Sequence, residues 1–290
     1  MATTRTEEHK VAAAKALAPR KLDRRVAVLG TGQMGGIIVQ GLLKAGLPPG
    51  HIHATVGHQD HAKALSATLG VPVGTDNRAA ASQADIIVLG VKPQTVRDVL
   101  EDIRPEVTPE QLVVSVAASV PTAYMEDVLM RPVPVVRAMP NTPCGVGYGM
   151  TGLCRGKYAT AAHLEAARSL FDTVGRTVVV DEKQMDAVTG LSASGPAFVY
   201  IILESLAEAG VKVGLPRDIA TLLSAQTLLG AAQVALLTGD HPALLKDAVT
   251  TPAGCTIDGI MELEDGKLRV TLIKAVVKAT QRAKELILDR

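Results

Sequence analysis

Aromatic residues are nearly absent from this chain. Only 2% of its 290 residues are Phe, Tyr or Trp, and it contains no Trp. Hydrophobic residues still make up 47% of the sequence, so the core must be built from Ala, Val, Leu and Ile. A chain of this length can form two domains of ordinary size.

Net charge and cysteine are also low, and each limits the expected functions. The formal net charge of +1 gives no reason to expect binding to nucleic acid or to a membrane. Cys144, Cys154 and Cys255 form no CxxC pair, and no HxxxH or His/Cys cluster indicates a metal. An odd number of free thiols is typical of a reducing compartment, so we expect a cytoplasmic protein.

Long uncharged apolar runs are missing as well. None reaches about 18 residues, so no membrane span is expected. Residues 1–24 lack the apolar stretch of a signal peptide and contain several acids, which are uncommon in transit peptides. We expect a loosely ordered or helical N-terminal extension there.

Short apolar runs alternate with helical stretches in the first half of the chain. Such runs are typical of parallel strands covered by helices on both faces. The expected strands are Val26–Leu29, Ile52–Val56, Val71–Val73, Ile86–Leu89, Leu112–Val116 and Val133–Val136, with further strands at Gly149–Cys154 and Thr177–Val180. The pattern predicts an α/β fold with an N-terminal, Rossmann-type, doubly wound parallel sheet.

From Glu182 onward, long Ala/Leu-rich stretches replace the strands. The expected helices are Pro196–Val213, Pro216–Leu237, Gly254–Leu263 and Leu268–Leu286. Residues 197–237 are apolar around much of the helix circumference, which is typical of buried helices. We expect two chains to interleave here, with a well-packed monomeric bundle as the alternative. The predicted domains are an extension (1–24), an NAD(P)-binding Rossmann domain (25–181) and an all-α substrate-binding and dimerisation domain (182–290).

A glycine-rich turn follows the first predicted strand. Its residues are Gly30, Thr31, Gly32, Gln33, Met34 and Gly35. In this GxGxxG pattern the first glycine permits a tight turn, the second lets a pyrophosphate approach, and the third allows close helix packing. We expect these residues to bind a dinucleotide; a purely structural turn is the alternative.

The end of the second strand bears on the choice of cofactor. An acid there would bind a ribose 2′-hydroxyl, but residues 54–59 contain none. Thr55, His58 and Lys63 can instead contact a 2′-phosphate, so we expect NADPH, with NADH also usable. A merely solvated His58 is the alternative.

Later strand ends complete the expected cofactor crevice. The residues are Val91, Lys92 and Pro93 after the fourth strand, Ala117 and Ala118 after the fifth, and Asn141 after the sixth. Small residues let a nicotinamide lie flat, and the Asn141 amide can bond its carboxamide. The alternatives are a surface role for Lys92 and a plain turn at Asn141.

A loop rich in hydroxyl groups precedes the helix expected at Gly254. Its backbone N–H groups and the hydroxyls of Thr250, Thr251 and Thr256 suit a small anion at a helix N-terminus. Cys255 lies where a thiolate is favoured, although a buried and inert thiol is the alternative.

In chain order, the glycine-rich turn, VKP, SVAAS, RAMPNTP, GLSASGPA and the loop 251–264 resemble pyrroline-5-carboxylate reductases. The resemblance covers residues 25–286. It implies that the chain reduces 1-pyrroline-5-carboxylate to L-proline by hydride transfer from NADPH or NADH, the last step of proline biosynthesis. It also implies a homodimer that can assemble further into a decamer.

The resemblance also implies roles for individual residues. The substrate carboxylate would be held by Val249, Thr250, Thr251, Gly254, Cys255 and Thr256, of which Thr256 matches the family's substrate-contacting, catalytic Thr. Asn77 matches an Asn that contacts the adenosine portion of the cofactor. Ala253 stands where the family frequently has Gly.

Two other functions stay open at this point. A β-hydroxyacid dehydrogenase would use a Lys on the first long helix of the second domain, but residues 190–202 contain none. A non-catalytic NADP(H) sensor would bind the cofactor and regulate a partner, which the intact substrate loop argues against.

Overall fold

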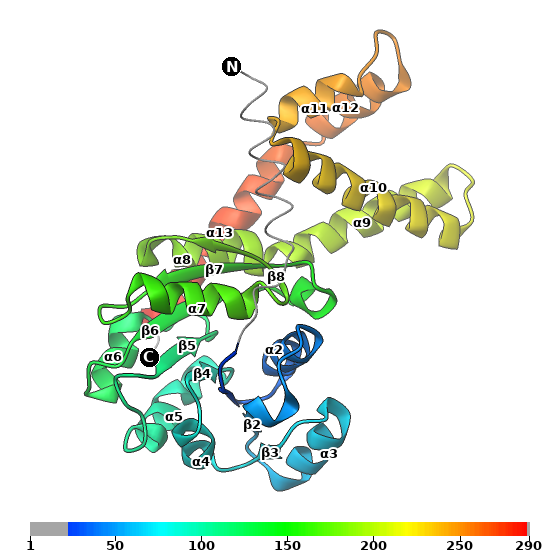
Figure 1. Cartoon of the computed structure of the whole chain (residues 1–290). Helices are drawn as coiled ribbons and strands as arrows, with labels where there is room; N and C mark the ends of the chain where they lie inside the picture. Colours follow the sequence, from blue (N-terminus) through cyan, green and yellow to red (C-terminus); the bar gives the residue numbers. More distant parts are fainter. Residues whose placement is uncertain (1–22, 289–290) are drawn as a thin grey trace. The chain divides into compact units, whose positions relative to one another are not determined.

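The computed structural model describes residues 23–288, so the expected extension lies almost wholly outside the described residues. Contacts divide the chain into two compact units (Figure 1). Of the described residues, 23–193 and 279–288 form one unit, and 194–278 form the other. The first division therefore falls after Ala193, later than the boundary at residue 182 suggested by the sequence.

The first unit is built on an eight-stranded sheet in the order β3-β2-β1-β4-β5-β6-β7-β8. Its strands are β1 (Val26–Leu29), β2 (Ile52–Thr55), β3 (Val73–Gly74), β4 (Ile86–Leu89), β5 (Leu112–Ser115), β6 (Val135–Met139), β7 (Gly149–Arg155) and β8 (Gly175–Val179). Every neighbouring pair is parallel except β6 and β7. The connection from β6 to β7 is too short for a parallel crossover, and this forces the antiparallel pairing.

Helices cover both faces of this sheet, as the doubly wound prediction requires. They are α2 (Gln33–Lys44), α3 (Gln59–Leu69), α4 (Asn77–Ser82), α5 (Val96–Ile103), α6 (Thr122–Leu129), α7 (Ala161–Phe171) and α8 (Met185–Val188). Short turns named below are η2 (Pro93–Thr95), η3 (Thr142–Val146), η4 (Glu182–Gln184) and the π-helical η5 (Thr189–Ala193).

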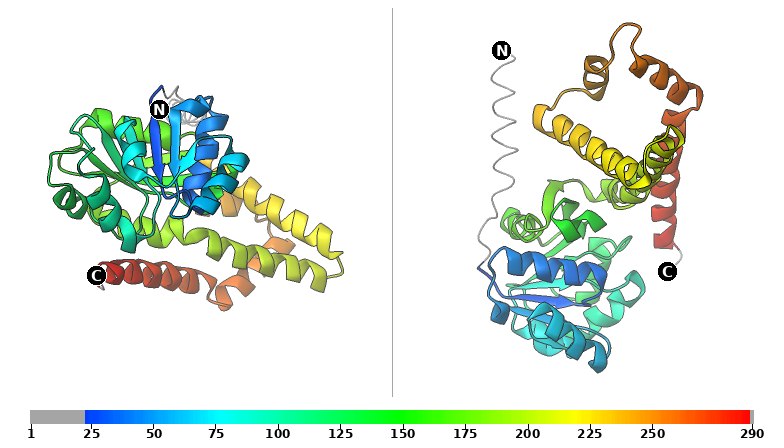
Figure 2. Two further views of the ribbon diagram at one scale, coloured as in Figure 1. Left: turned by 90° about the horizontal axis from the view of Figure 1, so that it is seen from below. Right: turned by 90° about the vertical axis from the view of Figure 1, so that its right-hand side faces the viewer.

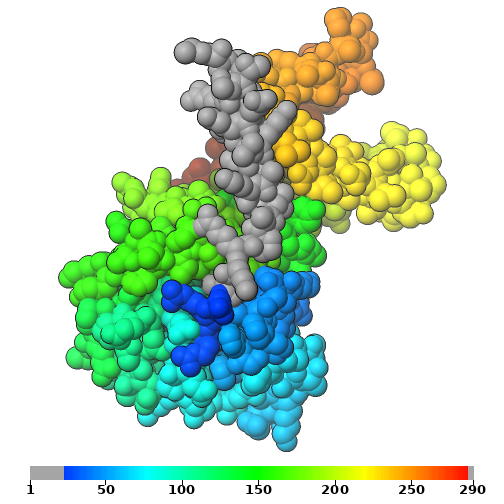
Figure 3. Space-filling model, viewed as in Figure 1, coloured from blue at the N-terminus to red at the C-terminus, as the bar shows by residue number. Residues whose placement is uncertain are grey.

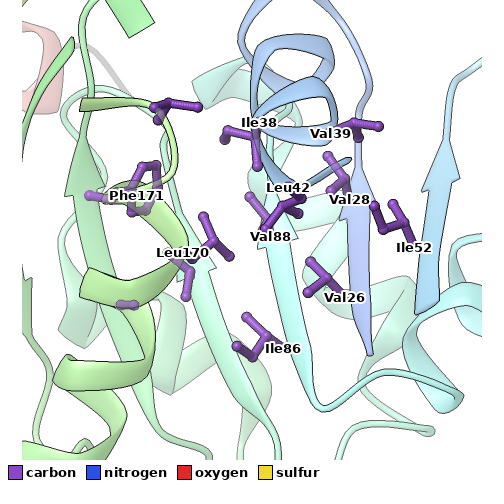
Figure 4. Close-up of a cluster of buried hydrophobic side chains, with 14 of the residues drawn as sticks. Val26, Val28, Ile38, Val39, Leu42, Ile52, Ile86, Val88, Leu170 and Phe171 are labelled. Atoms are coloured by element: carbon purple, nitrogen blue, oxygen red, sulfur yellow. The ribbon is translucent and has the colours of Figure 1, made fainter. Parts of the chain in front are cut away.

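Two aliphatic cores lie on opposite faces of the sheet. In one, Ile38 and Leu42 of α2 and Phe171 of α7 pack on Val28 and Val88 (Figure 4). The other joins the alternate strand residues to α4, α5 and α6. Continuous apolar strands are therefore buried on both sides, which confirms the predicted Rossmann-type architecture.

The second unit is helical among its described residues. Its helices are α9 (Gly195–Lys212), α10 (Arg217–Thr238), α11 (Pro242–Ala248), α12 (Cys255–Asp265) and the first part of α13 (Leu268–Leu288). Helices α9 and α10 lie side by side (Figure 2). Helix α11 was not expected; it begins at Pro242, and His241 Nδ1 accepts a hydrogen bond from the Ala243 N–H.

Helices α9 and α10 leave many large apolar side chains exposed. Figure 3 shows the surface of α10 in yellow. Examples are Tyr200, Ile201, Leu206, Leu222, Leu223, Leu229, Val234 and Leu236. Two helical segments are long and apolar enough to cross a membrane, namely Glu182–Lys212 and Arg217–Thr238. Length and composition alone are weak evidence for a membrane span, because core helices of other proteins pass the same test. Exposed apolar area of this extent also marks a protein–protein interface, as expected for chains that interleave.

Candidate functional site

The glycine-rich turn closes tightly against neighbouring strand ends. Gly30 has φ +88°, and a Cβ there would overlap Cγ1 of Val91. Both the conformation and the close approach therefore require glycine. The N–H groups of Gly30 and Thr31 donate to the Thr55 carbonyl at 3.1 and 2.8 Å, which ties the turn to the end of β2.

The start of α2 is open to an anion. Gly32 is its exposed N-cap residue, and the first intrahelical bond runs from Gly36 N–H to the Gly32 carbonyl at 2.8 Å. The preceding N–H groups, of Gln33, Met34 and Gly35, thus lie at the helix end without an acid in the first turn. This arrangement suits a pyrophosphate, as the sequence predicts.

At the end of β2, Thr55 contacts Asn77, a residue expected to contact the cofactor. Thr55 is buried, and its hydroxyl donates to Oδ1 of Asn77 at 2.7 Å. From the sequence, Thr55 is expected to contact a 2′-phosphate. In the structure the single hydroxyl proton of Thr55 is donated to Asn77, so it is not available to a phosphate. The Asn77 amide is held by this bond, with its NH₂ group left to donate elsewhere.

Exposed side chains follow at the N-terminus of α3, a few residues after the end of β2. His58 is the N-cap residue and makes no side-chain capping bond. His61, whose ring packs edge-on against His58 with centroids 6.1 Å apart, and Lys63 are also exposed. Asp60 in the first turn is the one acid of this helix start. His58 and Lys63 thus stay candidates for 2′-phosphate contact.

The ends of β4 and β5 lie beside the glycine-rich turn. Gly90 N–H donates to the Leu29 carbonyl at 2.7 Å, and Val116 N–H donates to the Leu89 carbonyl at 3.1 Å. This register brings Val91 and Ala117 to the carboxyl edge of the sheet, where such folds bind ligands. The Lys92 side chain is exposed, and Pro93 begins η2.

Asn141 is held mainly by internal contacts. Its Oδ1 accepts from Met150 N–H at 2.8 Å, and its Nδ2 donates to the Ser192 carbonyl at 3.2 Å. The amide therefore links the turn after β6 to β7 and η5. Its Nδ2 also donates to the Ser192 hydroxyl oxygen at 3.5 Å, so both amide hydrogens have acceptors within the protein. The nicotinamide contact of Asn141 stays a prediction.

Sequence reasoning missed a charge cluster around a buried arginine beside this edge. Arg137 of β6 is 2% exposed and lies 3.9 Å from Glu182 and 3.7 Å from Asp186. Thr122 donates to the Glu182 carboxylate through its N–H and its hydroxyl, both at 2.7 Å. Burial raises the pKa of the neighbouring Cys154 thiol to about 12, so this cysteine is an inert thiol at neutral pH.

The hydroxyl-rich loop belongs to the helical unit. Thr250 donates its hydroxyl proton to the Lys246 carbonyl at 2.8 Å, so its hydroxyl cannot also donate to an anion. Gly254 is the N-cap residue of α12, which places Cys255 and Thr256 in the first turn with their N–H groups at the helix end. Cys255 is exposed, contrary to the buried alternative.

Thr251 and Ala253 shape this loop. A Cβ on Gly254 would overlap the Thr251 hydroxyl, so the chain packs closely there. Ala253 has φ +56°, a conformation that favours glycine. The loop thus places the Thr251 hydroxyl beside the start of α12, whose first turn contains Thr256 and one acid, Asp258.

Comparisons with known proteins agree with this arrangement. The family model for pyrroline-5-carboxylate reductase dimerisation matches residues 182–286. The model described as NADP oxidoreductase, coenzyme F420-dependent, matches residues 25–119. These matches assign the exposed apolar helices to a dimerisation region and the sheet edge to an NADP-binding fold.

Full-length relatives extend the similarity to nearly the whole chain. A pyrroline-5-carboxylate reductase of Methanosarcina acetivorans is 45% identical over 91% of this chain and 98% of its own length. The structure of one from Coxiella burnetii, 38% identical, covers 91% of this chain and 98% of that chain with a TM-score of 0.85. A Plasmodium falciparum pyrroline carboxylate reductase with NADP bound, 28% identical, covers 92% and 100% with a TM-score of 0.82. By sequence and by structure, this chain belongs to the pyrroline-5-carboxylate reductase family.

Proposed function

We propose that this protein reduces 1-pyrroline-5-carboxylate to L-proline by hydride transfer from NADPH, the last step of proline biosynthesis. One observation carries the proposal: α2 begins at a glycine-rich turn with no acid in its first turn, and α12 begins at Gly254 after a loop that contains Thr250 and Thr251. The first suits a dinucleotide phosphate, and the second suits a small carboxylate.

The chemistry demands little acid–base machinery from the protein. NADPH, when bound, would supply the hydride for the imine carbon. Because the nitrogen of the protonated imine already carries its proton, no side chain has to donate one. The chain's residues then need only to bind and orient the two reactants. Backbone N–H groups at Cys255 and Thr256 would hold the carboxylate, with the Thr256 hydroxyl directed to the ring nitrogen.

The remaining loop residues would shape this carboxylate site. Val249, Thr251 and Gly254 would frame it, and Thr250 would serve through its position at the end of α11 rather than through its hydroxyl. On the sheet unit, Gly30–Gly35 would hold the pyrophosphate. Asn77 would meet the adenosine, while His58 would meet the 2′-phosphate.

The rival functions fit less well. A β-hydroxyacid dehydrogenase needs a Lys early on α9, where residues 195–211 have none and Lys212 is the last residue of the helix. A non-catalytic sensor would have no use for the loop at α12. Neither rival accounts for both sites.

We also propose that two chains interleave α9 and α10 into an obligate dimer in the cytoplasm, and that dimers assemble into a decamer. The exposed apolar side chains of these helices support this, because water contact over that area is unfavourable. Sedimentation at nanomolar concentration tests it; a stable, active monomer would contradict the dimer.

Steady-state kinetics test the function itself. NADPH oxidation should occur with 1-pyrroline-5-carboxylate and yield L-proline, with a higher kcat/KM for NADPH than for NADH. The six-membered imine homologue and a β-hydroxyacid with NADP⁺ serve as comparison substrates. NADPH binding without turnover of the imine would favour the sensor, and oxidation of the hydroxyacid would favour the dehydrogenase.

A further inference from the structure

Ser119 holds a backbone conformation that serine rarely adopts. It follows Ala117 and Ala118, the turn expected to receive the nicotinamide, and it has φ +60°. A side chain in this region costs about 1 kcal/mol or more relative to glycine. Ser119 is also only 1% exposed, so its hydroxyl must find a partner inside the protein.

That partner lies 164 residues later in the chain. The Ser119 hydroxyl donates a 2.9 Å hydrogen bond to the backbone carbonyl of Ala283, near the end of α13. Ala283 is itself buried. The bond therefore ties the turn after β5 to the part of α13 that groups with the sheet unit.

A second contact holds the same part of α13 against the sheet unit. A Cβ on Gly190 would overlap the Thr280 hydroxyl and lie 2.7 Å from the Thr280 backbone nitrogen, so η5 presses directly on α13. Two residues after Gly190, the Ser192 carbonyl accepts the amide of Asn141. The end of α13 thus contacts the turn after β5 directly and the turn after β6 through η5. Both turns are expected to contact the nicotinamide.

We propose that Ser119 is a positioning residue for hydride transfer. Its bond to Ala283 holds the Ala117–Ala118 turn where it orients the nicotinamide, which makes the end of α13 part of the cofactor-orienting structure. The inference rests on the proposed function. Glycine at this position would relieve the backbone strain of the positive φ. Serine adds the hydroxyl that bonds Ala283, which glycine lacks.

Two substitutions separate the bond from the strain. Ser119→Ala removes the bond and keeps the strain, whereas Ser119→Gly removes both. In each variant we expect kcat to fall roughly tenfold, because small misplacements of reacting groups are costly. The isotope effect with NADPH deuterated at the transferred position should rise as hydride transfer becomes limiting. The thermal midpoint of Ser119→Gly should exceed that of Ser119→Ala.

Binding measurements provide a readout that does not depend on turnover. The Kd of 2′-phospho-ADP-ribose, which lacks the nicotinamide, should stay unchanged in both variants, while the nicotinamide fluorescence of bound NADPH should change. Ser169→Ala is the matched control, since its hydroxyl also donates to a backbone carbonyl, that of Glu165 at 3.0 Å within α7.

The outcomes distinguish the positioning role of Ser119 from the proposed reductase function. Wild-type kcat, isotope effect and nicotinamide fluorescence in both Ser119 variants would overturn the positioning role, even if their stability fell. A wild-type protein that binds NADPH but does not reduce the imine would refute the proposed function. The fluorescence comparison would still decide whether Ser119 positions the nicotinamide.

Discussion

The hydroxyl of Thr55 and the side-chain oxygen of Asn77 are joined by a 2.7 Å hydrogen bond between the end of β2 and the start of α4. Thr55→Val keeps the β-branched shape and removes this bond, leaving Asn77 free to rotate. We expect the Kd for NADPH to rise two- to tenfold, corresponding to about 0.5–1.5 kcal/mol. Thr68→Val, which removes an exposed hydroxyl on α3, should leave the Kd unchanged; equal effects would argue against the role of Asn77.

His58→Asp should separate cofactor choice from stability. A carboxylate at this N-cap position repels a 2′-phosphate and can accept a 2′-hydroxyl, so kcat/KM for NADPH should fall about tenfold relative to NADH. Asp is also a good N-cap residue, so the thermal midpoint should be kept or raised. An unchanged NADPH/NADH ratio in steady-state kinetics would exclude His58 from the phosphate site.

Thr256→Val tests the substrate loop. Gly254, not Thr256, is the N-cap residue of α12, so loss of this hydroxyl should leave helix stability nearly intact. If the hydroxyl bonds the imine nitrogen, kcat/KM should fall by about ten- to a hundredfold, or roughly 1–3 kcal/mol. NADPH affinity should not change. Thr271→Val, in α13, is the control; normal kinetics in both variants would rule out a catalytic Thr256.

Ala253→Gly should stabilise the protein. Ala253 has φ +56°, and relief of this strain should outweigh the added freedom of glycine in the unfolded chain, for a net gain of about 0.5–1 kcal/mol. Ala64→Gly, at an exposed position within α3, should instead cost about 0.5–1 kcal/mol. Chemical denaturation of both variants checks the sign, and destabilisation by Ala253→Gly would contradict the strained loop.

Arg137→Met removes a buried charge while keeping much of the volume. Glu182 and Asp186 would lose their cation, so the free energy of unfolding should fall by about 3–5 kcal/mol. Arg97→Met, which breaks an exposed pair with Glu101, should change stability by less than about 1 kcal/mol. Similar losses in both variants would mean that the ion pairs of Arg137 contribute little to stability.

Local patterns in the sequence predicted most of the sheet unit. The strands Val26–Leu29 and Ile86–Leu89 occur with the expected bounds, because each apolar run that marks a buried strand is complete within four neighbouring residues. The antiparallel β7 depends on the length of a connection, which periodicity does not report. Helix α11 has only seven residues, too few to show a clear helical period.

Side-chain partners were harder to foresee than elements. The glycine-rich turn follows from spacing alone, because Gly30 and Gly35 act through their own backbone. The internal bonds of Asn141 depend on Met150 and Ser192, and Arg137 depends on carboxylates on η4 and α8. Such pairs form only when the whole unit folds, and a single sequence contains no signal for them.

The link between Ser119 and Ala283 has a consequence for how the protein is made. A ribosome adds about 5–20 residues per second, so the 164 residues that separate the two take roughly 8–30 seconds to synthesise. Strands β1 to β5 can pair during that interval, but the turn after β5 must wait for its acceptor. On a nascent chain, the nicotinamide side of the fold would therefore be completed well after the phosphate-binding side.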